Sequence, residues 1–292
     1  MHFMIVNGFT RTCGLIGNPV EHTMSPAIHN YLAEHTGQNL NYVPLRVEKG
    51  LLGDAVKGAF ALNLLGTNVT VPYKSEVIPY LEEVDELAAR IGAVNTLVRT
   101  ETGFKGYNTD MPGLFRAMQS DGVQVEGEKV MILGAGGVAR AVAVMLAEKG
   151  AAEIRILNRT VEKAEAIAAE INEMTGRKIA VAGMYEQYRE LPEKRQYLAI
   201  QATNVGMFPK SGEVIVEDPG FYRRIHTAYD LIFNPQETRF MKLAAESGAR
   251  SFNGLKMLLY QGIISYEYWT GCRITEELAQ GAYENMLLQM KA

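Results

Sequence analysis

The sequence predicts an α/β protein built of two domains, and three observations lead to this fold class. The chain has 292 residues, which is more than a single hydrophobic core usually serves. Short apolar runs alternate with helix-like segments, the order that builds a mostly parallel sheet with helices on its faces. The alternation then restarts near residues 111–113, so one domain is expected on each side of that point.

The first domain, residues 1–112, is expected to hold five strands and two helices. The strands are expected at residues 12–17, 41–45, 66–71, 92–98 and 103–107, the last as a hairpin return. The first helix opens at Ser25-Pro26 and ends at Gly37, because serine suits the N-cap and proline suits the first helical position. Residues 81–91 have helical spacing with acidic residues in the opening turns, which predicts the second helix.

The second domain, residues 113–252, is expected to hold a βαβ unit and further parallel strands. Its strands are expected at residues 129–133, 153–157, 197–202 and 227–233, after a short helix at residues 114–119. A long helix rich in alanine and valine joins the first two strands and ends at Gly150, as in a βαβ unit of ordinary size. Residues 253–292 are expected to form two helices, separated around residues 271–275, that pack back on the first domain.

Composition and charge exclude several classes of function. The 29 basic and 33 acidic residues are spread without blocks and give a net charge of −4, whereas a nucleic-acid surface needs clustered Lys and Arg. Residues 1–8 lack the basic region of a signal peptide, and no stretch approaches the roughly 20 apolar residues of a membrane helix. Cys13 and Cys272 form no disulfide framework, so we expect a cytoplasmic protein. The five histidines are scattered, which indicates no metal site.

A glycine-rich loop follows the strand expected at residues 129–133. Residues 134–139 fit the pattern G-x-G-x-x-A between a strand and a helix, which is typical of a Rossmann-type, doubly wound dinucleotide-binding domain. The first glycine permits a tight turn, the second lets the backbone approach a pyrophosphate, and the helix N-terminus offers free N–H groups. A turn that uses glycines for geometry alone is the alternative.

The end of the next strand indicates which dinucleotide is bound. Asn158, Arg159 and Thr160 stand where an NAD-binding domain usually has an acidic residue. Arg159 offers a planar donor fork for a 2′-phosphate, and Lys163 adds charge within one helical turn. These residues therefore favour NADP as the cofactor. The alternative is a solvent-facing arginine followed by Thr160 as an N-cap.

A lysine and a carboxylate are candidates for the reacting centre. Lys74 follows a short strand and Pro72, and Asp110 ends the run that begins at Gly106. A lysine is mostly charged at neutral pH, so it can give a proton to the alkoxide formed when hydride reaches a carbonyl. A neighbouring carboxylate would hold that lysine in place. The alternatives are a solvated surface lysine and, with Pro112 two residues on, a helix N-cap at Asp110.

Several of these runs together resemble the shikimate dehydrogenase family, over nearly the whole chain. The runs and the family patterns that they resemble are residues 17–26 (GNPxxHSxSP), 66–74 (GxNVTxPxK), 92–96 (GAVNT), 108–110 (NTD), 134–140 (GAGGxxR), 158–160 (NRT) and 254–261 (GxxMLxxQ). The order of the runs also matches. The resemblance implies that the first domain and the tail helices hold a substrate, while the middle domain holds NADP.

The resemblance implies a role for each matched residue. Lys74 and Asp110 are implied as the catalytic pair. The implied substrate-binding residues are Thr23 and Ser25, which would grip a carboxylate, with Asn68, Thr70, Asn95 and Gln261. The implied cofactor-binding residues are Gly134, Ala135, Gly136, Gly137, Val138, Asn158, Arg159, Thr160, Lys163, Thr203, Leu231, Phe233 and Gly254.

Three places depart from the family pattern. Thr23 stands where the family usually has serine, and Phe233 stands where it often has a tyrosine beside the nicotinamide. Residues 201–207 resemble NATSxGM with two changes. Threonine keeps the hydroxyl but alters the width of the pocket, and the missing tyrosine hydroxyl bears on substrate preference and rate.

The resemblance implies an enzyme for the NADP-dependent, reversible reduction of 3-dehydroshikimate to shikimate. Two alternatives stay open. One is a quinate/shikimate dehydrogenase that uses NAD or both cofactors, and the other is a non-catalytic sensor that binds NADP or shikimate. A small-molecule substrate is the expected partner, without nucleic acid or membrane, and a homodimer is left open.

Overall fold

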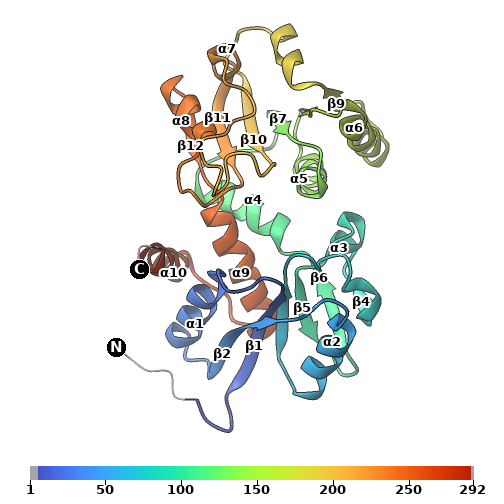
Figure 1. The fold of residues 1–292 in the computed structure, drawn as a ribbon, viewed down its shortest axis with the longest axis vertical. Coiled ribbons are helices and arrows are strands. Elements are labelled where there is room, and N and C mark those ends of the chain that lie inside the picture. Colours follow the sequence, from blue (N-terminus) through green and yellow to red (C-terminus); the bar gives the residue numbers. More distant parts are fainter. Residues whose placement is uncertain (1–5, 291–292) are drawn as a thin grey trace. The chain divides into compact units, whose positions relative to one another are not determined.

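The structure, a computed structural model that describes residues 6–290, has the predicted α/β fold class (Figure 1). The chain forms two compact units. The first unit contains the described residues through Leu114 together with those from Leu258 onward, and the second unit spans Phe115–Met257. Residues 1–5, part of the segment considered above as a signal peptide, lie outside the described range. Among the described residues we find no helix with the length and apolar character of a membrane span.

The first unit contains a six-stranded mixed sheet. In spatial order its strands are β2 (Leu40–Arg46), β1 (Arg11–Gly17), β3 (Gly66–Val69), β5 (Thr96–Arg99), β6 (Phe104–Tyr107) and β4 (Glu83–Val84). β1 is parallel to both of its neighbours, whereas β5 is antiparallel to both β3 and β6. The carboxyl ends of β1, β3 and β6 therefore meet the amino end of β5 at one edge of this sheet, which we call the first-sheet edge.

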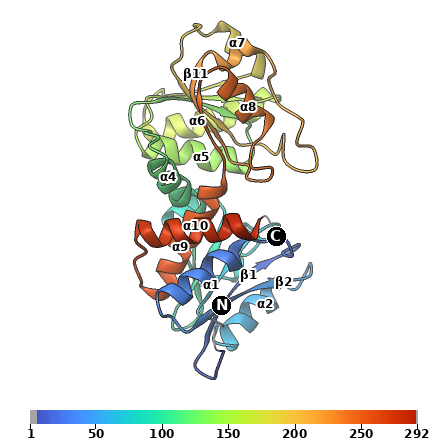
Figure 2. The same ribbon diagram turned by 90° about the vertical axis from the view of Figure 1, so that its left-hand side faces the viewer.

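Helices pack on both faces of the first sheet. They are α1 (Ser25–His35), α2 (Leu52–Ala61), the 3₁₀ helix η1 (Ile78–Tyr80), α3 (Glu86–Ile91) and α10 (Glu276–Gln289), with parts of α4 (Asp110–Ser120) and α9 (Leu255–Thr270). The chain passes from one unit to the other inside α4 and inside α9. α10 lies alongside α1 (Figure 2), so the tail helices pack on the first unit as the sequence predicts.

Two expectations for the first unit need correction. Residues 81–91 do not form one helix, because β4 pairs with β6 and α3 begins only at Glu86. The cause is local: the Asp85 side chain accepts a hydrogen bond from Leu87 N and caps α3 there. Ser25 is the first residue of α1 rather than its N-cap, which is Met24. The Thr23 hydroxyl accepts from Ser25 N at 3.2 Å and takes over part of the capping.

The second unit contains a six-stranded sheet whose strands are all parallel. In spatial order these are β12 (Arg250–Phe252), β11 (Ile225–Asp230), β10 (Tyr197–Gln201), β7 (Lys129–Leu133), β8 (Glu153–Leu157) and β9 (Ala180–Gly183). Every pairing between neighbours is parallel. β9 and β12 were not predicted from the sequence. Because the strands are parallel, the loops after β7, β8, β10 and β11 all leave the same edge of this sheet.

Helices on both faces make the second unit doubly wound. α5 (Gly137–Glu148) and α6 (Val161–Thr175) lie on one side of the sheet and α8 (Arg239–Glu246) on the other (Figure 1). The short helices η2 (Tyr185–Glu190) and α7 (Pro219–Tyr222) complete the unit. Right-handed crossovers that run in opposite directions from β7 place helices on opposite faces in this way.

Candidate active site

The predicted catalytic pair lies at the first-sheet edge. Lys74 follows β3 and Asp110 follows β6, so two strand ends bring them together. Lys74 Nζ donates to Asp110 Oδ2 at 2.7 Å, and the two side chains are 33% and 18% exposed. The Lys74 carbonyl accepts from Val94 N at 2.7 Å, which fixes the backbone beside β5. Lys74 is therefore a held, half-buried ion-pair partner rather than a free surface lysine.

A neighbouring asparagine leaves the Asp110 carboxylate free for the lysine. Asn108 Oδ1 accepts from the backbone N–H groups of Asp110 and Met111, at 3.1 and 3.4 Å, and so caps α4. Asp110 Oδ1 instead accepts from Asn95 Nδ2 at 2.9 Å. The Asn95 amide is oriented by Thr109 N, which donates to Asn95 Oδ1 at 2.7 Å. Asp110 thus receives both Lys74 and Asn95.

Behind this pair lies a buried polar network that motif analysis only partly found. Its members are Tyr42, Asn68, Asn95, Thr96, Thr109 and Ser265, all of them buried. Tyr42 Oη donates to Asn68 Oδ1 at 2.8 Å, and Asn68 Nδ2 donates to Thr96 Oγ1 at 3.0 Å and to Ser265 Oγ at 2.9 Å. Tyr42 and Ser265 were not predicted from the sequence. One signal was available for Ser265, which lies one helical turn after Gln261 on the same helix face.

Aromatic rings pack against the far side of this network. The Tyr42 ring stacks on His29 with centroids 4.2 Å apart, and Trp269 lies 5.1 Å from His29. Burial lowers the pKa of His29 to about 3 and raises the pKa of Tyr42 well above its ordinary value. Both side chains are therefore uncharged at neutral pH, and Tyr42 acts as a hydrogen-bond donor.

The other predicted substrate-binding residues lie in the first unit as well. Thr23 Oγ1 donates to Ser25 Oγ at 3.2 Å, which makes an adjacent pair of hydroxyls at the start of α1. An added Cβ at Gly17 would overlap the Thr70 side chain, so the end of β1 passes directly beside Thr70. Gln261 lies on α9, where Nε2 donates to Leu258 O at 2.8 Å.

The glycine loop in the second unit has the features that a pyrophosphate needs. Gly134 has a φ of +113°, and an added Cβ would lie 2.6 Å from Thr203 Cγ2, so only glycine suits the turn. Nothing lies within 4 Å of an added Cβ at Gly136 or Gly137, and α5 begins there with no side-chain cap. Its first N–H groups are available to an anion. Ala135 belongs to the same loop, and the exposed Val138 is the second residue of α5.

The residues after β8 fit a phosphate on the adenosine side. Arg159, Thr160 and Lys163 are exposed, and Asn158 Nδ2 donates to Thr160 O at 2.9 Å. The Thr160 side chain makes no capping hydrogen bond to α6, which removes the alternative role suggested by the sequence. Over residues 6–290 no carboxylate pairs with Arg159 or Lys163. A cationic pair without an acidic partner suits a 2′-phosphate.

The loops after β10 and β11 carry the remaining cofactor candidates. Thr203 N and Oγ1 both donate to Gln201 Oε1 at 2.7 Å. An added Cβ at Gly254 would overlap Leu231 O, so Gly254 permits close packing on the strand that leads to Phe233. These loops leave the same sheet edge as the glycine loop, so the predicted cofactor residues lie along one edge of the second unit.

A buried carboxylate closes the loop that contains Leu231 and Phe233. Asp230 is 0% exposed, and its two oxygens accept from Ile232 N at 3.0 Å and from Thr238 Oγ1 at 2.6 Å. Burial raises the pKa of Asp230 to about 6, against the lowering effect of these two hydrogen bonds. Asp230 thus ties the first and last residues of this loop together.

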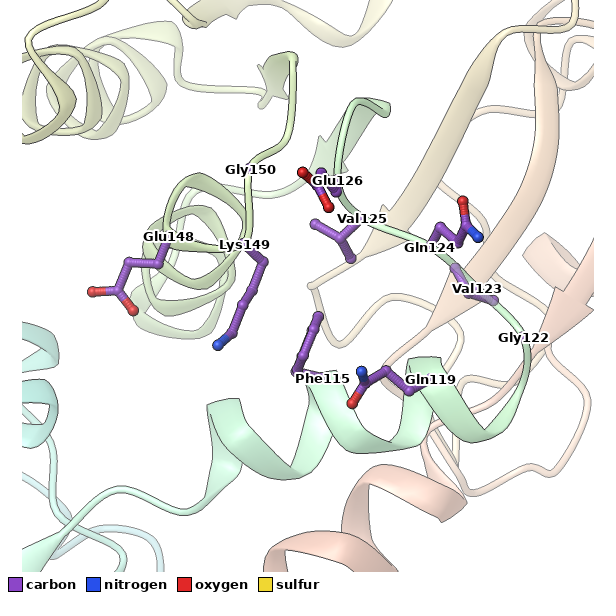
Figure 3. Close-up of a pocket in the computed structure, with 10 residues that line it drawn as sticks. All are labelled: Phe115, Gln119, Gly122, Val123, Gln124, Val125, Glu126, Glu148, Lys149 and Gly150. Atoms are coloured by element: carbon purple, nitrogen blue, oxygen red, sulfur yellow. The ribbon is translucent and has the colours of Figure 1, made fainter.

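An open groove of about 870 Å³ lies at the opposite edge of the second sheet (Figure 3). Its lining includes residues 122–126 and 148–150, which precede β7 and β8, whereas the glycine loop follows β7. Lys149 points toward Phe115, with Nζ 4.7 Å from the ring centroid (Figure 3). None of the predicted site residues lines this groove.

Comparison with known proteins identifies the family of this chain. Residues 15–97 match the family model "Shikimate dehydrogenase substrate binding domain", residues 116–191 match "Shikimate / quinate 5-dehydrogenase", and residues 254–277 match "Shikimate 5'-dehydrogenase C-terminal domain". A shikimate dehydrogenase (NADP(+)) from Carboxydothermus hydrogenoformans is 41% identical over 273 residues, 92% of this chain and 94% of that protein. The chain belongs to the shikimate dehydrogenase family. A second family member named shikimate dehydrogenase (NADP(+)), from Desulforamulus reducens, is 44% identical over 270 residues, 91% of this chain and 92% of that protein.

Solved structures of shikimate dehydrogenases and of one other reductase have the same fold. Shikimate 5-dehydrogenase from Listeria monocytogenes in complex with shikimate and NAD has a TM-score of 0.87 and 33% identity, over 94% of this chain and 97% of that chain. The Thermus thermophilus enzyme in complex with NADP(H) and shikimate has a TM-score of 0.82 and 32% identity, over 95% and 100%. The 5-ketofructose reductase of a Gluconobacter strain has a TM-score of 0.81 and 33% identity, over 96% and 100%.

Proposed function

We propose that this protein catalyses the reversible, NADP-dependent reduction of 3-dehydroshikimate to shikimate. The observation that carries the proposal is the 2.7 Å ion pair between Lys74 and Asp110, held by Asn95 at the first-sheet edge. The names of the curated relatives support this reaction and this cofactor.

The proton chemistry falls to Lys74. When bound, NADPH supplies a hydride to the 3-keto carbon. Lys74 Nζ gives a proton to the ketone oxygen, and the C=O group becomes a C–OH group; in the reverse direction Nζ takes the proton from that hydroxyl. Asp110 keeps Nζ in position through the 2.7 Å contact. Asn95 in turn holds the Asp110 carboxylate, so the donor is oriented before the substrate arrives.

Hydroxyl and amide side chains of the first unit are proposed to orient the substrate. Thr23 and Ser25, an adjacent pair of hydroxyls, would bind the substrate carboxylate with support from the start of α1. Asn68, Thr70 and Gln261 would contact the ring hydroxyls. Asn68 Nδ2 is already engaged with Thr96 and Ser265, so its contribution to a substrate is the remaining acceptor capacity of Oδ1.

Three segments of the second unit are proposed to hold NADP. The glycine loop and the first turn of α5 (Gly134, Ala135, Gly136, Gly137 and Val138) would bind the pyrophosphate, because Gly136 and Gly137 are open and the start of α5 has no side-chain cap. Asn158, Arg159, Thr160 and Lys163 would bind the 2′-phosphate and the adenosine. Thr203, Leu231, Phe233 and Gly254 would line the nicotinamide half.

The test compares two lysines in similar surroundings. Lys74→Ala removes the proposed proton donor, whereas Lys105→Ala removes a lysine that is also 33% exposed and ion-paired, with Glu83 at 2.9 Å. We expect Lys74→Ala to lower kcat by roughly 10²–10⁴-fold with a smaller change in the KM for shikimate. Lys105→Ala should keep wild-type kinetics. Equal losses in kcat and in substrate binding would contradict a role for Lys74 in the transition state.

Steady-state kinetics with several substrates and cofactors separate the alternatives. The Listeria structure contains NAD, and the 5-ketofructose reductase acts on another ketone within the same fold. We therefore compare kcat/KM for shikimate and quinate with NADP and NAD, and for 5-ketofructose with NADPH. A highest value for shikimate with NADP supports the proposal. A flat NADPH absorbance trace with proven binding of both ligands would indicate a sensor instead.

We also infer a cytoplasmic location from the two free thiols. Cys13 is buried, Cys272 is partly buried, and neither forms a disulfide in the part of the chain that the structure describes. Proteins of a reducing compartment keep their thiols free. Activity recovered only in the membrane or extracellular fraction of cells would contradict this inference.

A further inference from the structure

We propose that Ser265, on α9, is a positioning residue for the reaction, acting through Asn95 and Asp110. The inference rests on the function proposed above and extends the site to a helix of the C-terminal tail. No family pattern quoted above includes this position.

The Ser265 side chain joins three elements of the first unit. It is 0% exposed, and its Oγ lies 2.9 Å from Asn68 Nδ2 on β3, 2.8 Å from Thr96 Oγ1 on β5 and 3.2 Å from Thr109 Oγ1 after β6. These elements carry the proposed substrate-binding and catalytic side chains. A single hydroxyl on α9 therefore contacts one side chain on each of these three elements.

The direction of these hydrogen bonds makes Ser265 an acceptor. A serine hydroxyl has one proton, and Ser265 Oγ donates it to Gln261 O at 2.9 Å, one turn earlier on α9. Its lone pairs then accept from Asn68 Nδ2 and from a threonine hydroxyl. Because the Ser265 hydroxyl donates to a backbone carbonyl of its own helix, the Ser265 oxygen is held in one place.

Two short steps connect this fixed acceptor to the catalytic pair. Thr109 Oγ1 lies 3.0 Å from Asn95 Nδ2, and Thr96 Oγ1 lies 3.1 Å from Asn95 Oδ1. Asn95 Nδ2 also donates to Asp110 Oδ1 at 2.9 Å. Without the Ser265 oxygen, the threonine hydroxyl that donates to it can turn to another partner. Asn95 then keeps the hydrogen bond from Thr109 N but loses side-chain support, so its amide and the Asp110 carboxylate that holds Lys74 are less firmly positioned.

The test uses a second hydroxyl on the same helix as its control. Ser265→Ala removes the proposed acceptor. Thr270→Val removes a hydroxyl that likewise donates to the carbonyl one turn earlier, Tyr266 O at 2.8 Å, but has no contact with the network. We expect Ser265→Ala to lower kcat with shikimate about 10- to 100-fold, because small misplacements of catalytic groups cost that much. The KM for NADP and the kinetics of Thr270→Val should stay at wild-type values.

Two further measurements separate positioning from a loss of folding and from failure of the proposed function. Thr96→Val removes the hydroxyl between Ser265 and Asn95, and the double variant Ser265→Ala/Thr96→Val should lose no more activity than the more impaired single variant. Additive losses overturn the proposal, as does an equal kcat for Ser265→Ala and Thr270→Val. An inactive wild type refutes the proposed function alone. In that case a crystal structure of Ser265→Ala tests the positioning role. If Lys74, Asp110 and Asn95 have the same positions as in the wild type, the positioning role is overturned.

Discussion

Asp230 offers a prediction whose size follows from its surroundings. The side chain is 0% exposed and accepts only neutral donors, Ile232 N and Thr238 Oγ1. Burial therefore raises its pKa from 3.8 to about 6. The change we consider is Asp230→Asn, which has nearly the same shape and cannot ionise.

The sign of the effect follows from proton linkage. Between pH 3.8 and about 6 the folded state binds a proton at Asp230 that the unfolded state has released. The contribution of this group to stability is therefore complete below pH 3.8 and is lost as the pH rises through about 6. The loss runs at about 1.4 kcal/mol per pH unit. Over a window of roughly two pH units, the total is about 3 kcal/mol.

Urea unfolding followed by far-ultraviolet circular dichroism, at pH values from 4 to 8, checks this number. The free energy of unfolding of the wild type should fall by about 3 kcal/mol relative to Asp230→Asn across that range. Asp54→Asn makes the same chemical change at an exposed aspartate of α2 and should run parallel to the wild type. Parallel curves for the wild type and Asp230→Asn would refute the reasoning.

Two further predictions concern the cofactor and the packing of the first unit. Arg159→Ala should lower kcat/KM for NADP at least tenfold more than for NAD, because each charge-assisted hydrogen bond to a phosphate contributes roughly 1.5–3 kcal/mol; steady-state kinetics with equal losses for both cofactors would argue against this role. Gly66→Ala should destabilise the protein by about 3 kcal/mol, because the added Cβ would overlap Trp269 Nε1 and Leu97 O. Gly58→Ala, inside α2 with nothing within 4 Å of the added Cβ, should stabilise it by roughly 0.5–1 kcal/mol, and the urea midpoints of the two variants should shift in opposite directions.

Two central strands of the second unit were predictable because each leaves a clear sequence signal. β7 and β8 have the bounds expected from the sequence, Lys129–Leu133 and Glu153–Leu157. After Lys129, β7 is the continuous apolar run typical of strands covered on both sides, whereas β8 alternates polar and apolar residues before Leu157. β9 was missed because Ala180–Gly183 consists of small residues, two of them not buried. The helix expected over residues 81–91 was wrong because pairing of β4 with β6 overrode the local helical spacing.

The candidate site was predictable where its residues cluster along the chain. Lys74 and Asp110 stand at strand ends that meet at one sheet edge, and both lie in runs that carry the family resemblance. From the local pattern alone, Asp110 was as good a helix cap as a catalytic group, and only the structure shows that Asn108 takes the capping role. Tyr42 carries no local signal and Ser265 only its spacing from Gln261, because each reaches the network from a separate element through tertiary packing.

The position of Trp269 has a practical consequence for experiments on this protein. It is the single tryptophan of the sequence, it is 5% exposed, and its indole N–H donates to Leu97 O at 2.9 Å beside the buried His29. Its emission therefore reports on the first unit alone, without any contribution from residues 115–257. A red shift that precedes or follows the loss of helical signal would reveal that the two units melt in separate steps.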